Sequence, residues 1–145
     1  MRHRASRCAW LILLLSAAAS VQAQVASRLI EEVSVAELDG YATVTILFGC
    51  DVRYVSHFPA SSGDTLRIRL SPGAGCGSPA AGWVVPPMLD GSGVIRSVTV
   101  DRTLARDVDM GIRWSKPEQF VLVPSTTRRE LRLLLVRPET DRSKV

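Results

Sequence analysis

The sequence has few of the residues on which most enzymes depend for catalysis. It holds two histidines, and His57 is the only one beyond the first 23 residues. No Gly-x-Ser-x-Gly turn frames a serine, and no glycine-rich loop between a strand and a helix is placed to cradle a phosphate. One histidine and two cysteines in this region are too few for a typical zinc site. We therefore expect no catalytic residue, no bound metal and no cofactor.

A hydrophobic run long enough to cross a bilayer is also missing. The apolar run Trp10–Leu15, continued by a serine and three alanines, is about half of the ~20 residues that a transmembrane helix needs. Three arginines precede it and Val21-Gln22-Ala23 follows it, which is the pattern of a signal peptide. Cys8 precedes the run, so it is not placed as a lipoprotein cysteine. We expect cleavage after Ala23 and export to the bacterial periplasm, with retention as an anchor as the alternative.

The chain that remains after cleavage has little net charge. The whole sequence contains 18 lysines and arginines and 14 acidic residues, a formal charge of +4. Three of the arginines and none of the acids lie in residues 1–23, which leaves 15 basic against 14 acidic residues, or +1. Nucleic-acid binding depends on clustered positive charge. We therefore expect no nucleic-acid partner.

Cysteine is rare as well, because the chain contains three and Cys8 leaves with the signal peptide. The remaining pair, Cys50 and Cys76, would meet the oxidising periplasm, where an even number of cysteines suggests a disulfide bond. Each lies at the end of an expected strand or in a loop beside one. We predict a Cys50–Cys76 bridge, with two buried thiols as the alternative.

No segment shows sustained helical periodicity, and apolar residues alternate with polar ones instead. Alternation is clearest where Leu66, Ile68 and Leu70 face one side and two arginines face the other. This pattern is typical of a half-buried antiparallel strand. Residues 71–87 are rich in glycine and proline and are expected to form a loop with a short strand at 82–85. The other expected strands are 30–35, 41–48, 51–58, 65–70, 94–100, 107–114, 119–123 and 130–136.

The second set of expected strands repeats the first. Apolar positions match at spacings of 64 or 65 residues, and Phe58-Pro59 matches Val123-Pro124. A single four-stranded unit cannot bury its apolar face alone, whereas two units cover one another. We predict an all-β fold, a β-sandwich of two similar, mostly antiparallel four-stranded sheets from an internal repeat, with barrel-like closure as the alternative. The matched positions are Ile30, Val33, Val35, Val44, Ile46, Phe48, Leu66, Ile68 and Leu70 against Ile95, Val98, Val100, Val108, Met110, Ile112, Leu131, Leu133 and Leu135.

Four motifs occur in a recognisable order: an Ile-x-x-Val-x-Val start at Ile30, the run 42–48, a Val-Arg-Tyr piece, and a Leu-Arg-Ile-Arg-Leu strand. Together they resemble the AMIN domain, an accessory β-sandwich of periplasmic N-acetylmuramoyl-L-alanine amidases and of secretins. The resemblance covers nearly all of residues 28–138. It implies association with peptidoglycan and targeting to the septum or the pole. The expected organisation is a signal peptide at 1–23, an AMIN-like domain at 24–138 and a polar tail at 139–145.

Outward-facing arginines are the strongest candidates for a binding surface. Three stand on the polar side of the fourth and last expected strands, and an arginine and a tyrosine of the third strand lie nearby in the chain. Guanidinium groups suit the carboxylates and phosphates of envelope glycans and lipids; a solvated sheet face is the alternative. Trp83 joins them because an indole in a loop can stack on a sugar, whereas Trp114 and His57 are expected to be structural. The candidates are Arg53, Tyr54, Arg67, Arg69, Trp83 and Arg132.

These features predict a periplasmic cell-envelope module without enzymatic activity. Its expected role is to bind peptidoglycan or to target the cell wall. The alternative is a protein-interaction module of a secretion, pilus or envelope machine, which would bind an envelope protein through a sheet edge. No stable transmembrane segment is expected after processing.

Overall fold

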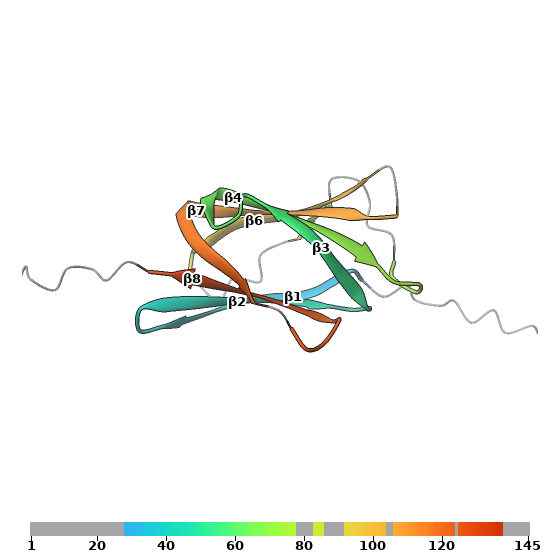
Figure 1. Ribbon diagram of the computed structural model, residues 1–145, viewed down its shortest axis with the longest axis horizontal. Helices are drawn as coiled ribbons and strands as arrows, with labels where there is room; N and C mark the ends of the chain where they lie inside the picture. The colour runs from blue at the N-terminus through green and yellow to red at the C-terminus, as the bar shows by residue number, and fades with distance from the viewer. Residues whose placement is uncertain (1–27, 78–82, 86–91, 104–105, 124, 138–145) are drawn as a thin grey trace, which may run out of the picture.

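The computed structural model describes residues 28–77, 83–85, 92–103, 106–123 and 125–137 (Figure 1). These residues form eight strands and no helix, and every strand pair is antiparallel. The all-β prediction is therefore confirmed. No helix in these ranges is long and apolar enough to span a bilayer. The strands are β1 (Ile30–Leu38), β2 (Tyr41–Phe48), β3 (Val52–Phe58), β4 (Ser62–Pro72), β5 (Trp83–Val85), β6 (Ile95–Arg102), β7 (Val108–Val123) and β8 (Glu130–Val136).

The strands form one continuous sheet that folds over into two facing layers (Figure 1). The upper layer of the figure holds β3, β4, β6 and the first part of β7, and the lower layer holds β1, β2, β8 and the last part of β7. The short strand β5 pairs with β6. β7 belongs to both because residues 108–114 pair with β6 and residues 108–113 with β4, whereas residues 119–123 pair with β8. Residues 118 and 119 also pair with the start of β4. Pro117 lies between these two parts and has no N–H to donate to a ladder.

Two expectations about the strands are wrong. Residues 107–114 and 119–123, predicted as separate strands, belong to the single bent strand β7. The two halves of the chain also do not each form a sheet, since β1–β2 lies in the lower layer and β3–β4 in the upper. The segment between the two predicted strands is Ser-Lys-Pro-Glu, which bends the chain without reversing it. The chain therefore crosses between layers inside a strand, and the hydrogen-bonded ladder stays continuous.

Apart from β5, which pairs with β6 in the upper layer only, the two layers have the same strand order and closely related registers. The order β1-β2-β8-β7 of the lower layer corresponds to β6-β7-β4-β3 of the upper. Three of the four strands correspond at 65 residues, as from Val33 to Val98, and the second at 66, as from Ile46 to Ile112, rather than the predicted 64. The observed spacing of 66 and the predicted spacing of 64 differ by two residues, which is one period of the pleat. Each matched side chain therefore stays on the face of the sheet that was predicted for it. The corresponding register pairs are Val33–Ile46 and Val98–Ile112, Ile46–Leu131 and Ile112–Leu66, and Phe58–Arg67 and Val123–Arg132.

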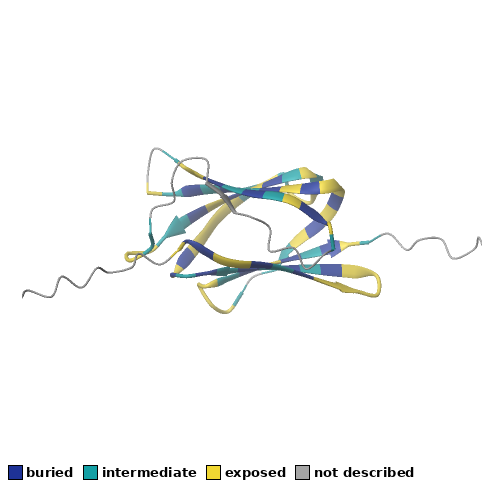
Figure 2. Ribbon diagram, turned by 180° about the vertical axis from the view of Figure 1, so that it is seen from behind, coloured by how far each residue is buried: buried dark blue, intermediate teal, exposed yellow. Residues whose placement is uncertain are grey.

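The hydrophobic core lies between the layers and is built from alternate residues of facing strands (Figure 2). Ile46, Ile68 and Met110 are completely buried, as the alternation predicts. Trp114 is 2% exposed and lies against Phe120 with ring centroids 6.3 Å apart, so the expected core position is confirmed. The intervening residues of the same strands face away from the core, and each layer therefore presents an outer face to solvent.

Cys50 and Cys76 form the predicted disulfide bond, with their Cα atoms 5.3 Å apart. Cys50 lies in the short connection between β2 and β3, and Cys76 follows β4. The Gly73 amide donates to the Asp51 carbonyl over 2.8 Å beside the bridge. The start of the edge strand β3 is thus held to the end of its neighbour by a covalent bond as well as by the ladder.

Candidate functional site

Two adjoining hollows lie on the outer face of the upper layer. One, of about 330 Å³, is lined by β4, β6 and β7, and the other, of about 280 Å³, by β3, β4 and β7. Arg67 and Asp109 line both hollows, so the two form one surface, which we call the outer trough. Its residues are Ser56, His57, Phe58, Thr65, Arg67, Arg69, Ser97, Thr99, Asp101, Asp109, Gly111 and Arg113.

The pleat of the sheet brings these side chains together. Arg67, Gly111 and Thr99 are cross-strand partners in one row, and Thr65 and Arg113 are partners in the next. Neighbouring rows on one face are about 7 Å apart along the strands. Gly111 leaves room for the Thr99 hydroxyl on the floor of the trough, because a Cβ at this position would come within 2.8 Å of that hydroxyl. The hollow thus depends on a residue without a side chain between longer ones.

The arginines of the outer trough differ in their partners. Arg69 is held by Asp109, with Nε 3.0 Å from Oδ1 and Nη2 3.4 Å from Oδ2. The hydrogen bond to Asp109 and the charge of its carboxylate raise the pKa of Arg69 above its ordinary value. Arg67 and Arg113 form no ion pair with any described residue. These two guanidinium groups are therefore the ones available to a ligand.

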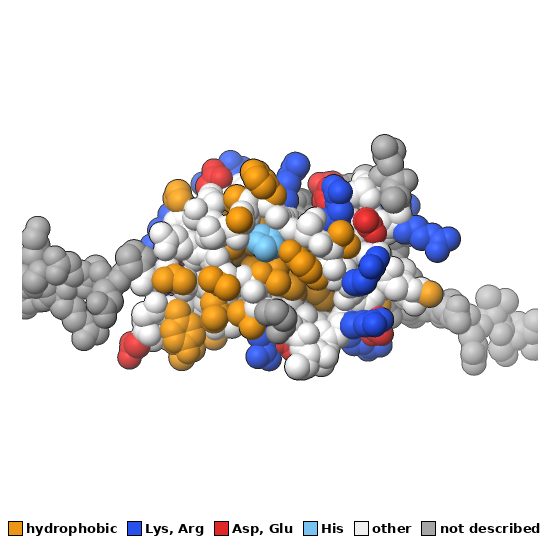
Figure 3. All heavy atoms as spheres, in the orientation of Figure 1, with side chains coloured by type: hydrophobic (Ala, Val, Ile, Leu, Met, Phe, Trp, Pro, Cys, Tyr) orange, Lys and Arg blue, Asp and Glu red, His pale blue; other side chains and the backbone are white. Residues whose placement is uncertain are grey.

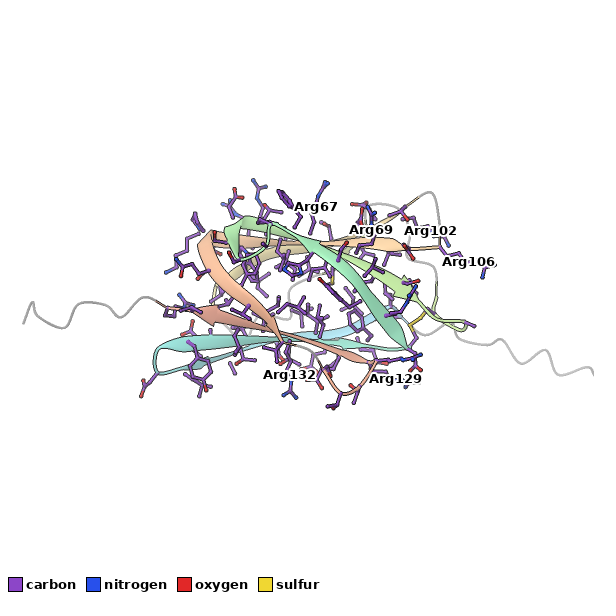
Figure 4. All side chains as sticks on the ribbon, viewed as in Figure 1. Arg67, Arg69, Arg102, Arg106, Arg129 and Arg132 are labelled. Carbon is purple, nitrogen blue, oxygen red and sulfur yellow. A yellow bond between two sulfur atoms is a disulfide. The ribbon has the colours of Figure 1, made fainter. Side chains whose placement is uncertain are left out.

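The structure separates the predicted binding arginines. Arg67 and Arg69 stand on the upper layer, whereas Arg132 lies on the opposite side of the molecule (Figure 4) and is ion-paired with Glu130. Arg53 is exposed on β3 opposite Ser71 and does not line either hollow. Arg132 is excluded from the trough because β8 is in the lower layer, which the alternation of one strand cannot show.

Tyr54 and His57 interact with each other at the edge of the upper layer. The Tyr54 hydroxyl lies 2.6 Å from His57 Nδ1, and His57 Nε2 lies 3.0 Å from the Ala60 carbonyl oxygen. A neutral imidazole satisfies both contacts by accepting at Nδ1 and donating at Nε2. Both ring nitrogens are thus engaged locally. Trp83, the remaining candidate, begins β5, but its side chain lies outside the described residues.

Of the residues that line the outer trough, the sequence predicted only Arg67 and Arg69 as binding residues. Phe58, Gly111 and Arg113 are three of those that it missed. Phe58 is 75% exposed, the highest value among the large apolar side chains described, and it pairs directly with Arg67. Arg113 carries a usable signal, since it alternates outward between two core residues. Its nearness to Arg67 could not be inferred, because nothing local indicates that β7 pairs with β4.

The outer trough offers cations and hydroxyl groups for binding. The described residues contain no cluster of three or more histidine, cysteine or acidic side chains that could hold a metal ion. Comparison with known proteins adds no relative, since no family model, no curated protein and no solved structure matches this chain.

Proposed function

We propose that the processed chain is a non-catalytic module of the bacterial periplasm that binds peptidoglycan through the outer trough. The observation that carries the proposal is the pair Arg67 and Arg113, two cations that form no ion pair with any described residue, at a hollow bordered by hydroxyl groups. Peptidoglycan presents carboxylates and sugar hydroxyls, which these groups complement. The resemblance to the AMIN domain supports the same class of ligand.

Phe58 adds an apolar surface next to the charged part of the trough. Its ring is largely exposed and its strand position faces Arg67. An apolar contact beside a few directed polar groups is a common composition of ligand sites. A sugar ring, with an apolar face of C–H groups and a rim of hydroxyls, fits such a surface, and this favours a glycan polymer over a small inorganic anion.

Export to the periplasm is part of the proposal and rests on residues 1–23, which lie outside the described residues. The disulfide bond supports it, because such bonds persist in oxidising compartments. Mass spectrometry of the protein isolated from a bacterial periplasm is expected to find Gln24 at the amino terminus. Recovery of the chain with residues 1–23 attached to a membrane fraction would contradict cleavage.

We also propose that the two halves of the domain are copies of one ancestral unit that together form a β-sandwich. The matching strand order and the 65-residue correspondence support this. In this arrangement each copy gives its first hairpin to one layer and its second to the other. Arg67 and Arg132 then occupy equivalent positions on opposite faces, and they make a matched pair for testing function.

Sedimentation with purified sacculi tests the binding proposal. The wild-type protein is expected to sediment with sacculi. The double variant Arg67→Ala with Arg113→Ala is expected to bind sacculi at least about tenfold more weakly, because two charge-assisted contacts are lost. Arg132→Ala is the control, since it removes the equivalent charge from the other layer. Failure of the wild type to sediment above a control protein of similar size and charge would remove the proposal.

A second function, protein interaction, is favoured by the edge strand β3. This strand ends the order of the upper layer, and Tyr54, Val55 and Phe58 on it are exposed apolar side chains. Apolar side chains gather on the side of the molecule that β3 crosses (Figure 3). Open edges accept strands from partners. This function predicts an envelope protein that co-purifies with the wild type but not with Val55→Lys, and no affinity for sacculi.

A further inference from the structure

Arg67 and Arg113 are diagonal neighbours on adjacent strands. Arg67 pairs with Gly111, and Arg113 pairs with Thr65. Arg113 is therefore two residues beyond the partner of Arg67, at the next position on the same outer face. Cβ atoms in such a diagonal are about 7 Å apart, within reach of long side chains. Two like charges at this distance repel one another when neither has a counter-ion. An anion seated between them would replace this repulsion with two attractions.

The groups around the two arginines suit an oxyanion. Gly111 places no side chain between them and admits the Thr99 hydroxyl, and the hydroxyls of Thr65 and Ser97 line the same hollow. Guanidinium forks and hydroxyls all donate hydrogen bonds to oxygen, and the two oxygens of a carboxylate match a guanidinium edge. We call Arg67, Gly111 and Arg113 the arginine seat.

The charge of the trough limits the charge of the ligand. Among the residues that line the trough, three arginines, at 67, 69 and 113, outnumber two aspartates, Asp101 and Asp109, by one. Asp101 and Asp109 are also direct cross-strand partners, so both carboxylates lie beyond the seat, with Arg69 bonded to Asp109. A carboxylate, with a single negative charge, balances the site. A phosphate monoester, with about −1.5 to −2 charges at neutral pH, overcompensates it and approaches the aspartates.

We propose that the arginine seat binds a free carboxylate of the peptide stems of peptidoglycan, while the sugars contact the trough toward Phe58. This inference rests on the proposed function, which it refines by naming the chemical group that is recognised. It assigns Arg113 the same importance as Arg67, although only Arg67 belongs to the sequence-predicted set. It also predicts discrimination against stems whose carboxyls are amidated.

A soluble disaccharide-peptide released from sacculi by a muramidase tests the seat, compared with the same compound after conversion of its carboxyls to amides. Calorimetry is expected to show that amidation weakens binding to the wild type about tenfold or more. Arg113→Ala is expected to weaken binding of the free acid similarly and to respond no further to amidation. Arg113→Lys keeps the charge without the guanidinium fork, so its affinity for the free acid is expected to lie between those of the wild type and Arg113→Ala. The affinity of Arg132→Ala is expected to match that of the wild type.

Three results would overturn the inference. The first is that the amide binds the wild type as tightly as the acid does. The second is that the affinity of Arg113→Ala still falls when the ligand is amidated. The third is that phosphatidylglycerol vesicles bind more tightly than the disaccharide-peptide in a way that depends on Arg113, which would assign the seat to a phosphate. Thermal unfolding of Arg113→Ala checks that the fold is intact.

A lactate titration separates failure of the seat from failure of the proposed function. The Nε–H resonances of Arg67 and Arg113 are followed by NMR, with lactamide as the control. If the wild type ignores sacculi but these resonances shift with lactate and not with lactamide, the seat stands and the peptidoglycan function falls. If neither compound shifts them, the seat itself is overturned.

Discussion

At the scale of single residues, position on the pleat decides the energetic role of a side chain. Leu133 and Leu134 are adjacent and chemically identical, yet Leu133 is completely buried whereas Leu134 is half-buried on the outer face. Leu133 lies across from Val44 of β2 and from Leu122 of β7. The same substitution at the two sites therefore removes core packing in one case and mostly solvent contact in the other.

We expect Leu133→Ala to lower the free energy of unfolding by about 2–5 kcal/mol, because the lost methyl groups leave a cavity in a packed core. Leu134→Ala is the matched control and is expected to cost about 1 kcal/mol or less. Urea denaturation followed by circular dichroism measures both. Equal losses at the two positions would contradict the assigned faces.

A buried carboxylate provides a second test at this scale. Glu118 is 5% exposed, Arg137 Nη1 lies 3.7 Å from its Oε1, and Arg137 Nη2 lies 3.2 Å from Glu37 Oε1. Arg137→Ala is expected to destabilise the fold by about 1–3 kcal/mol, because Glu118 loses the cation that offsets its desolvation. Adding Glu118→Gln to that variant is expected to recover part of the loss in the same urea assay. Full additivity of the two changes would show that the pair does not interact.

At the scale of elements, the disulfide bond joins two segments that the ladder also brings together. Cys50 and Cys76 are separated by 26 residues that include β3 and β4. The bond restricts this loop in the unfolded chain, and it holds the start of β3, whose outer edge has no strand beside it among the described residues. Both the stability of the domain and the alignment of Phe58 with the trough depend on that hairpin.

Replacing both cysteines with alanine is expected to lower the free energy of unfolding by about 3–4 kcal/mol, the loop-entropy value for a loop of this length. Denaturation of the processed protein with and without reductant supplies the comparison. Reductant is expected to shift the wild-type midpoint toward that of the double variant and to leave the variant unchanged. A wild type insensitive to reductant would contradict a stabilising bridge.

At the scale of the whole molecule, each layer is assembled from both halves of the chain. The lower layer combines β1 and β2 with β8 and the end of β7, and the upper layer combines β3 and β4 with β6 and the start of β7. Neither half therefore contains a complete layer. The central pairings, β2 with β8 and β4 with β7, join strands that are far apart in sequence.

Fragments 24–91 and 92–145 are accordingly expected to be unfolded when each is produced alone. Each would expose an apolar hairpin face without a partner, and isolated two-stranded hairpins are marginal in water. Far-UV circular dichroism and amide chemical-shift dispersion measure the folding of each fragment. Mixing the two is expected to restore the native spectrum. A cooperative unfolding transition in fragment 24–91 alone would contradict this account.

The sequence alone determined the fold class, most of the strands, many residues of the core and the cysteine pair. These features follow from local physics, because alternation with a period of two depends only on neighbours in the chain and selects which side chains leave water. Ile46, Ile68, Met110 and Leu133 were identified in this way, and so was the outward direction of Arg67 and Arg69.

Only the tertiary structure decided which strands lie side by side. Alternation is the same whichever neighbour a strand has, so it could not show that β7 bends and serves both layers. For the same reason it could not place Arg113 beside Arg67 or send Arg132 to the opposite face. Pairing is settled by the joint burial of all apolar faces at once, and the outer trough is a consequence of that global choice.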